Sequence, residues 1–149
     1  MSERNKAVPA SYLILEKEGK VLLGQRINTG YCDGYYDLPA GHVEAEELPL
    51  RALIREAMEE IGIEILPEDV QFVHVIYRPK HDETGERVDF FFKALKYSGE
   101  PSIKEPNKCG DLQWFPYDDL PEKVTPHVRD VLGRYRKGIN YSELSSNNN

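Results

Sequence analysis

Acidic residues recur at helical spacing in one segment of the chain, Gly41 to Ile63, which reads GHVEAEELPLRALIREAMEEIGI. Glu56, Glu59 and Glu60 are separated by three and four positions, so on an α-helix they project from one face. Leucine, isoleucine and alanine residues fall on the neighbouring arc, which indicates a buried side. The segment therefore predicts a helix with a row of carboxylates at the margin of an apolar core.

The ends of this helix are also predicted by residue type. Pro49 suits the first turn, because the missing N–H of proline has no helical partner there. Gly62 suits the left-handed residue that ends a helix. We therefore expect the helix to run from Pro49 to Ile61.

Three carboxylates one turn apart repel one another and raise one another's pKa, so their placement on one short helix favours a neutralising cation. Carboxylate oxygens without histidine or thiolate select Mg²⁺ or Mn²⁺ rather than zinc. Glu47 precedes the helix and adds a fourth carboxylate if the loop folds back. The alternative is a solvated acidic face with Arg51 and Arg55 as ion-pair partners. The fixed spacing of the whole segment favours the metal site.

The segment resembles the signature of the Nudix hydrolase family. The matching positions are Gly41, Glu47, Arg55, Glu56, Glu59, Glu60 and Gly62, with apolar residues at Ala57 and Ile63. The resemblance implies an α/β (α+β) fold, an α/β/α sandwich in which a central mixed β-sheet lies between helices and the motif forms a loop-helix-loop unit. It also implies cleavage of a diphosphate linkage, X attached to a nucleoside diphosphate, with Mg²⁺ or Mn²⁺.

The resemblance assigns roles to single residues. The expected metal ligands are Glu56, Glu59 and Glu60, with Glu47 directly or through water and a backbone carbonyl near Ala40 or Gly41. The general base is either one of these carboxylates or lies on a later loop, where Glu105 is the preferred candidate. Arg55 is expected to hold the glutamates through charge-assisted hydrogen bonds, with a generic surface ion pair as the alternative.

Substrate-binding candidates lie outside the motif. Arg26, at the end of a strand, is expected to reach a phosphate, and Tyr36, in a tyrosine-rich loop, to stack against a base. The stretch 105–109 followed by Trp114 resembles MutT-like members that act on nucleoside triphosphates, so Trp114 is a third candidate. The alternatives are a solvated arginine, aromatic packing under a loop, and a core tryptophan.

Alternating apolar residues and turn signals predict the remaining elements. Strands are expected at 8–17 and 20–26, forming a first hairpin, at 70–78 and 87–97, joined by a polar loop over 79–86, and at 111–117. A terminal helix is expected over 121–137, with Pro126 near its start. A single domain is expected over 1–140, followed by a disordered polar tail over 141–149.

Length and composition restrict the class of protein. The chain has 149 residues, which fits one domain, and a net charge of −7, which argues against holding a nucleic-acid polymer by charge. A small nucleotide remains a fitting partner, because bound cations reverse the local field. Cys32 and Cys109 lie far apart, which favours a reducing compartment and a cytoplasmic enzyme. The absence of a long apolar run argues against a membrane span. A homodimer remains open.

These expectations favour a Mg²⁺-dependent hydrolase of a nucleoside triphosphate, such as the oxidised purine nucleotide 8-oxo-dGTP, which yields a monophosphate and pyrophosphate. One alternative is a non-catalytic Nudix-fold module that senses a nucleotide. A Nudix enzyme for ADP-ribose, nucleotide sugars or dinucleoside polyphosphates is a further alternative. Tyr77 and Pro79 fall near the family's markers for such substrates but not clearly in register.

Overall fold

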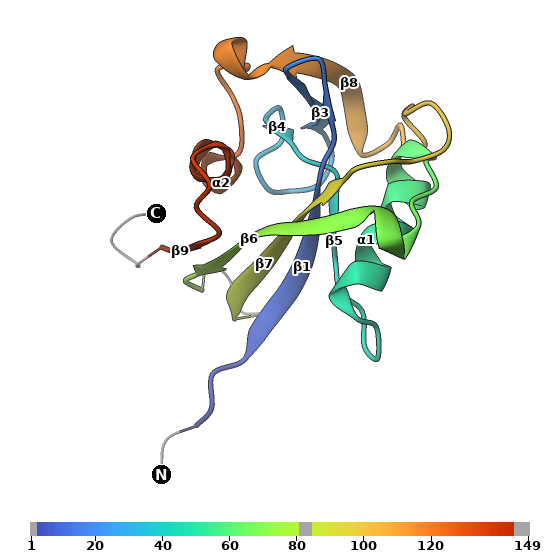
Figure 1. Ribbon diagram of the computed structural model, residues 1–149. Helices are drawn as coiled ribbons and strands as arrows, with labels where there is room; N and C mark the ends of the chain where they lie inside the picture. The colour runs from blue at the N-terminus through green and yellow to red at the C-terminus, as the bar shows by residue number, and fades with distance from the viewer. Residues whose placement is uncertain (1–2, 81–84, 145–149) are drawn as a thin grey trace.

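The computed structural model describes residues 3–80 and 85–144, and its centre is a five-stranded mixed sheet (Figure 1). In spatial order the strands are β5 (Ala40–His42), β1 (Ala7–Ile14), β7 (Glu86–Ala94), β6 (Val70–Arg78) and β9 (Tyr141–Glu143). The pairs β1–β7 and β6–β9 are parallel, whereas β1–β5 and β6–β7 are antiparallel. The mixed sheet expected from the sequence is thus confirmed. Part of the predicted loop 79–86 lies outside the described residues.

A second sheet of four strands is centred on β3 (Lys20–Arg26). Its other strands are β8 (Cys109–Pro116), β2 (Glu16–Lys17) and β4 (Tyr36–Asp37). The first hairpin was predicted to be longer, and this prediction is wrong: β1 pairs with β5 and β7, and only the short β2 pairs with β3. The reason is that β1 is a central strand, buried on both faces, which contributes side chains to both hydrophobic cores.

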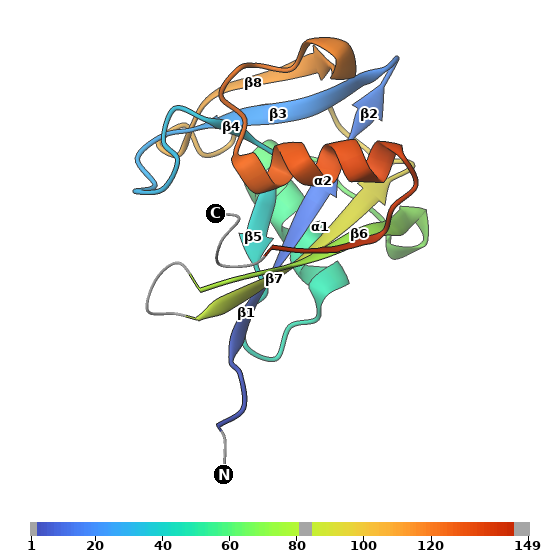
Figure 2. The same cartoon turned by 90° about the vertical axis from the view of Figure 1, so that its left-hand side faces the viewer.

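The two main helices cover opposite faces of the five-stranded sheet, with α2 (Pro126–Arg136) in front and α1 (Pro49–Ile61) behind in Figure 2. Side chains of β1 alternate between the two cores: Tyr12 and Ile14 lie in the core with α2, and Leu13 in the core with α1. Two short 3₁₀ turns, η1 (Pro67–Asp69) and η2 (Tyr117–Asp119), complete the connections.

Both helices begin at a proline. Helix α1 has the predicted bounds, and Gly62 ends it with a φ of 72°. Helix α2 begins at Pro126 rather than at residue 121. The preceding residues are held extended, because Tyr36 of β4 donates its N–H to the carbonyl of Lys123 and accepts from the N–H of Thr125. The helix therefore starts only after this ladder ends.

Residues 141–143 form a strand, so the prediction of a disordered tail is wrong for this part; residues 145–149 lie outside the described residues. The strand is anchored by His74, which is fully buried in β6. The ring atoms Nδ1 and Nε2 of His74 lie 2.9 Å from the carbonyl of Ile139 and 2.7 Å from the hydroxyl of Ser142. These two contacts of His74 could not be predicted from the sequence, because residues 139–149 are mostly polar and show no strand pattern.

Ser142→Ala is expected to lower the free energy of unfolding by about 1–3 kcal/mol, because it leaves the buried Nε2 of His74 without a partner. Denaturant unfolding measures the change. Ser102→Ala is the matched control, since Ser102 is exposed and is expected to be neutral. Equal stability of the two variants would show that the contact with His74 does not anchor β9.

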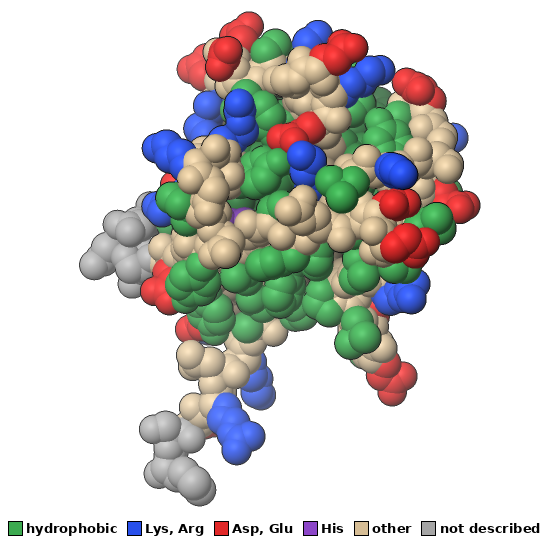
Figure 3. Space-filling model, viewed as in Figure 1, with side chains coloured by type: hydrophobic (Ala, Val, Ile, Leu, Met, Phe, Trp, Pro, Cys, Tyr) green, Lys and Arg blue, Asp and Glu red, His purple; other side chains and the backbone are tan. Residues whose placement is uncertain are grey.

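The surface of the described region shows hydrophobic side chains gathered over β6 and β7 (Figure 3). Among large apolar residues, Phe72 of β6 is 47% exposed, and its ring meets that of Phe92 edge-on. Neither α1 nor α2, nor any other helix in the described ranges, has the length and apolar character needed to cross a membrane.

Candidate active site

A cavity of about 410 Å³ opens between α1, the sheet edge at β5 and the strands β3 and β7. This volume lies within the range of small-molecule sites, about 300–1,000 Å³. Of the residues that the sequence predicted to act in catalysis, metal binding or substrate binding, the lining includes Arg26, Ala40, Gly41, Glu56, Glu59, Glu60 and Glu105. The fold thus gathers residues that are far apart in sequence around one cavity.

Gly41 lies directly against Glu56. A Cβ atom at position 41 would overlap the carboxyl group of Glu56. Gly41 belongs to β5, whose ladder with β1 holds it in place, opposite Ser11. The glycine is therefore required for space, because it lets a carboxylate of α1 lie flat against the edge strand.

Glu60 is a motif carboxylate whose pKa is raised by its surroundings. Burial raises its pKa well above the usual value, and the negative charges of Glu56 and Glu105 raise it further. The backbone N–H of Ala40 opposes this effect by donating to Oε2 at 3.3 Å. Glu60 thus keeps partial contact with solvent through the cavity, yet holds its negative charge at a cost.

Glu105 reaches the cavity from the loop that precedes β8. The loop is tied to the end of α1, because the N–H of Lys104 donates to the carbonyl of Glu60 at 3.0 Å and the N–H of Ser102 donates to that of Ile61. The N–H groups of Lys108 and Cys109 both donate to the carbonyl of Glu105. These backbone bonds hold the carboxylate of Glu105 beside the motif glutamates.

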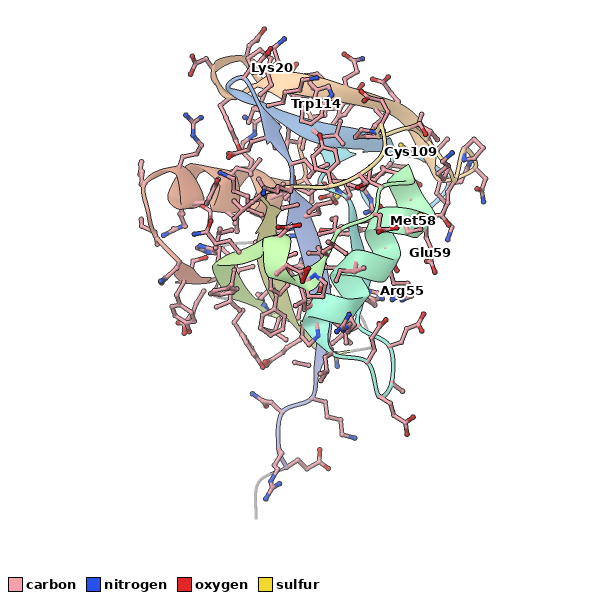
Figure 4. All side chains as sticks on the ribbon, turned by 45° about the vertical axis from the view of Figure 1, so that its right-hand side comes forward. Lys20, Arg55, Met58, Glu59, Cys109 and Trp114 are labelled. Atoms are coloured by element: carbon pink, nitrogen blue, oxygen red, sulfur yellow. The ribbon has the colours of Figure 1, made fainter. Side chains whose placement is uncertain are left out.

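Arg55 holds three of the motif carboxylates together. Its Nε and Nη2 donate to the two oxygens of Glu47 at 2.8 and 3.0 Å, and its Nη1 donates to Glu56 at 2.7 Å and to Glu59 at 3.2 Å. Figure 4 shows Arg55 and Glu59 together on the outward side of α1. The guanidinium also donates to the carbonyl of His42 in β5. This geometry would suit a positioning role for Arg55.

Glu47 does not line the cavity, because both of its carboxylate oxygens accept hydrogen bonds from Arg55. The guanidinium lowers the pKa of Glu47 to about 2. The stabilising contribution of this pair is therefore present above pH 4.5 and is lost as the pH falls towards 2. The expectation of a fourth ligand at Glu47 is not supported by this position, which instead fixes Arg55.

Arg55→Ala is expected to lower kcat/KM by roughly 10- to 100-fold, the usual cost of removing a group that orients metal ligands. Without the guanidinium, Glu56 and Glu59 lose the donor that fixes their carboxylates. Arg51→Ala is the matched control, since Arg51 is an exposed residue of the same helix and is expected to be neutral. Steady-state kinetics checks both variants, and equal rates would assign Arg55 to a surface ion pair.

The donor set suits a hard divalent cation. Glu56 lies close enough to raise the cost of ionising Glu60, and a cation between the two carboxylates would remove that cost. No three acidic, imidazole or thiol side chains within 3–80 and 85–144 are already arranged around a common point. Glu59 is turned towards Arg55, and its side chain is 51% exposed, so it is free to turn towards the cavity.

Tyr36 and Trp114 do not line the cavity. The hydroxyl of Tyr36 donates to Asp111 at 2.5 Å, which raises the pKa of Tyr36 to about 12, and its ring packs edge-on against Phe115. Trp114 packs against the core beside α1 and lies in β8, apart from Arg55 and Glu59 in Figure 4. Their expected roles in substrate binding are not supported. The alternatives, aromatic packing for Tyr36 and packing with the core for Trp114, describe them better.

Arg26 lines the cavity, but each of its three nitrogens already donates within the protein. Nε donates to the carbonyl of Tyr31 at 2.8 Å, Nη1 to Asp37 at 3.3 Å and Nη2 to Thr29 at 3.1 Å. Asp37 is buried, which raises its pKa to about 6. Arg26 therefore supports the loop after β3 and keeps a buried carboxylate ionised.

Sequence reasoning missed a second polar group at the cavity: Arg78, Arg87 and Asp89. Arg78 pairs with Arg87 across the β6–β7 ladder, and Asp89 lies two residues further along β7 on the same face. The signal was available in the run RVDFFF, where two charges alternate with valine at the start of an apolar strand.

Comparison with known proteins identifies the family to which this fold, with its carboxylate-lined cavity, belongs. The NUDIX domain model matches residues 5–135. The chain therefore belongs to the Nudix family, and its relatives mark it as a hydrolase that acts on acid anhydrides.

Similar curated proteins differ in their named substrates. The ADP-ribose pyrophosphatase of Methanocaldococcus jannaschii is 29% identical over 84% of this chain and 72% of its own length. The 8-oxo-dGTP diphosphatase of Proteus vulgaris is 35% identical over 44% of this chain and 58% of its own length. An RNA pyrophosphohydrolase of Helicobacter pylori is 28% identical over 82% of this chain and 81% of its own length.

Solved structures show the same fold. The MutT NUDIX hydrolase of Burkholderia pseudomallei superposes with a TM-score of 0.78 at 29% identity, over 86% of this chain and 97% of that one. The ORF135 protein of E. coli gives a TM-score of 0.63 at 25% identity, over 76% of each chain. These similarities confirm the α+β fold.

Proposed function

We propose that this protein hydrolyses the diphosphate linkage of a small nucleotide with the help of Mg²⁺ or Mn²⁺. The observation that carries the proposal is that four glutamates, Glu56, Glu59, Glu60 and Glu105, line one cavity. These carboxylates would repel an anionic nucleotide unless cations bridged the carboxylates and the phosphates.

Glu56, Glu59 and Glu60 would hold the cation, together with a backbone carbonyl near Ala40 or Gly41. When bound, a divalent cation neutralises phosphate charge and lowers the pKa of water. Arg55 keeps the ligands in place from outside the cavity. Glu47 supports this arrangement through Arg55 rather than as a ligand.

Glu105 is the proposed general base. It lies on a different element from the ligands, and its loop is fixed to the end of α1 by the hydrogen bond from Lys104 to Glu60. A carboxylate beside the motif glutamates can accept a proton from water while they remain ligands. Lys108, exposed on the same loop, lines the cavity and is suited to the phosphates.

A nucleoside triphosphate is the favoured substrate, with an oxidised purine nucleotide such as 8-oxo-dGTP as the example, and the products would be a monophosphate and pyrophosphate. The similarity to an 8-oxo-dGTP diphosphatase, at 35% identity over 65 residues, supports this preference. ADP-ribose is the second candidate, because the relative from M. jannaschii that bears this name aligns over 84% of the chain.

The proposed setting is the cytoplasm, with small nucleotides as partners and no nucleic-acid polymer or membrane. Cys32 and Cys109 are both free, which fits a reducing compartment. The net charge of −7 disfavours a long RNA, although relatives named RNA pyrophosphohydrolases make RNA worth testing. All the cavity residues named above come from one chain, so a homodimer would not be needed to complete the site.

A substrate panel with Mg²⁺ and identification of the products tests the proposal. The panel contains canonical and oxidised nucleoside triphosphates, ADP-ribose, nucleotide sugars, dinucleoside polyphosphates and RNA with a 5′-triphosphate. Hydrolysis of a triphosphate to monophosphate and pyrophosphate, abolished by EDTA, is expected. Melting shifts with nucleotides but no product release would instead indicate a sensor module.

A further inference from the structure

One oxygen of a buried carboxylate at the cavity accepts no hydrogen bond from the residues that the structure describes. Asp89 of β7 is 0% exposed and lines the cavity. Its Oδ2 accepts a hydrogen bond from Nε of Arg78 at 2.6 Å, whereas its buried Oδ1 accepts none from the described residues. Buried polar atoms are nearly always paired, so an orphan acceptor at a cavity wall is a place where a water or a ligand supplies the donor.

The ligand group that donates a hydrogen bond to Oδ1 of Asp89 is not an ionised phosphate. A carboxylate oxygen only accepts hydrogen bonds, and ionised phosphate oxygens do the same, so the two repel each other. Burial raises the pKa of Asp89, and the neighbouring Arg78 and Arg87 oppose this and favour the carboxylate form. The orphan oxygen therefore fits a nitrogen or oxygen donor in the uncharged part of a nucleotide.

The walls near Asp89 favour a base over a sugar. The ring of Tyr12, which lines the cavity, is stacked on Phe91 with a centroid distance of 4.6 Å, and Leu38 adds an apolar surface. Flat aromatic and apolar walls suit a planar ring.

We infer that Asp89 is a specificity-determining residue whose Oδ1 accepts a hydrogen bond from an N–H group on the edge of the substrate's base. The inference rests on the proposed function of this cavity as a nucleotide site. Arg78 acts as the positioning partner, since its hydrogen bond to Oδ2 fixes the carboxylate. Nucleotides whose base offers no N–H would be rejected, because the buried oxygen would remain unpaired.

The ligand-side test uses the wild-type protein and calorimetry of nucleoside monophosphates, so no turnover is needed. The monophosphates of guanosine and adenosine carry edge N–H groups, whereas that of purine riboside keeps the ring and carries none. We expect purine riboside monophosphate to bind roughly 10- to 100-fold more weakly, the range for a lost hydrogen bond to a charged acceptor. The 2′-deoxy forms are expected to bind like the ribose forms.

Three results would overturn the inference: equal affinity for the purine riboside nucleotide, no binding of any monophosphate, or a loss confined to the 2′-deoxy forms, which would assign Oδ1 to a sugar hydroxyl. The protein-side test is Asp89→Asn, with Asp118→Asn as a control at an exposed position. The discrimination is expected to disappear only in the Asp89 variant, and its persistence there would also overturn the inference. If that variant does not fold, the wild-type measurement still decides.

Hydrolysis assays on the same preparation separate this inference from the proposed function. Cleavage of nucleotides with no preference for edge N–H groups would overturn the inference alone. Discrimination in binding without cleavage of any nucleotide would overturn the proposed function and support the inference.

Discussion

Glu60→Gln is expected to lower kcat by roughly 10³-fold or more and, at the same time, to raise the melting temperature. The loss follows from its position in the cavity, since removing a group that only supports a metal ligand already costs about 10- to 100-fold. The gain follows because burial and neighbouring carboxylates raise the pKa of Glu60, so its charge destabilises the folded state at neutral pH.

The electrostatic account also predicts how the stability gain of Glu60→Gln changes with pH. A carboxylate whose folded pKa lies above its usual value of 4.5 binds protons more readily in the folded state, so it lowers stability as the pH rises beyond 4.5. The gain in melting temperature of Glu60→Gln over wild type is therefore expected to be larger at pH 8 than at pH 5, in EDTA. Glu64→Gln, at an exposed position, is the control and is expected to be neutral.

Glu59→Gln separates the two effects. The side chain of Glu59 is 51% exposed, so the variant is expected to lose most turnover without a comparable gain in stability. Kinetics and thermal melting are measured on both variants. Near-normal kcat with Mg²⁺ in either variant would count against the assignment of the site, and a lower melting temperature of Glu60→Gln would contradict its electrostatic account.

Gly41→Ala is expected to lower kcat/KM by roughly 10²-fold while leaving the fold intact. A Cβ atom at position 41 would overlap the carboxyl of Glu56, and displacing a reacting group by about 1 Å costs this much. Gly41 is not one of the glycines with positive φ, so the backbone tolerates alanine and only the space is lacking. The change in kcat/KM therefore reports on the position of the Glu56 carboxylate.

Gly133→Ala is the matched control for this variant. Gly133 lies in α2, and a Cβ atom added there would meet no other atom within 4 Å, so alanine fits and is expected to stabilise the helix by up to about 1 kcal/mol. Unchanged kinetics of Gly41→Ala would mean that Glu56 moves aside without consequence, which would contradict its role as a ligand.

The ends of α1 could be predicted closely because their signals are local. A proline at the first turn, a left-handed glycine after Ile61 and apolar residues at helical spacing all act within one segment. The pairing of β1 could not be predicted this way, because local hydrophobicity does not say which strand becomes its partner. The same holds for β9, whose anchor is a contact between His74 and Ser142.

The residues of the candidate site also differ in whether local sequence signals could predict their positions. Glu56, Glu59 and Glu60 share a helix face, so spacing alone predicted that they lie together. Glu56 and Glu60 do so, whereas Glu59 is turned towards Arg55. Glu105 was expected near them on the strength of family resemblance, and the structure brings it to the cavity. The packing of Trp114 against the core and the position of Asp89 at the cavity depend on which strand faces which helix, and this is a tertiary property.

The most direct measurement is a crystal structure of the protein with Mn²⁺ and a non-hydrolysable nucleoside triphosphate analogue, with anomalous scattering to locate the metal. We predict an ion held by oxygens of Glu56, Glu59 and Glu60 and shared with the phosphates. A bound nucleotide with these side chains apart, and no anomalous peak among them, would contradict the proposed metal site.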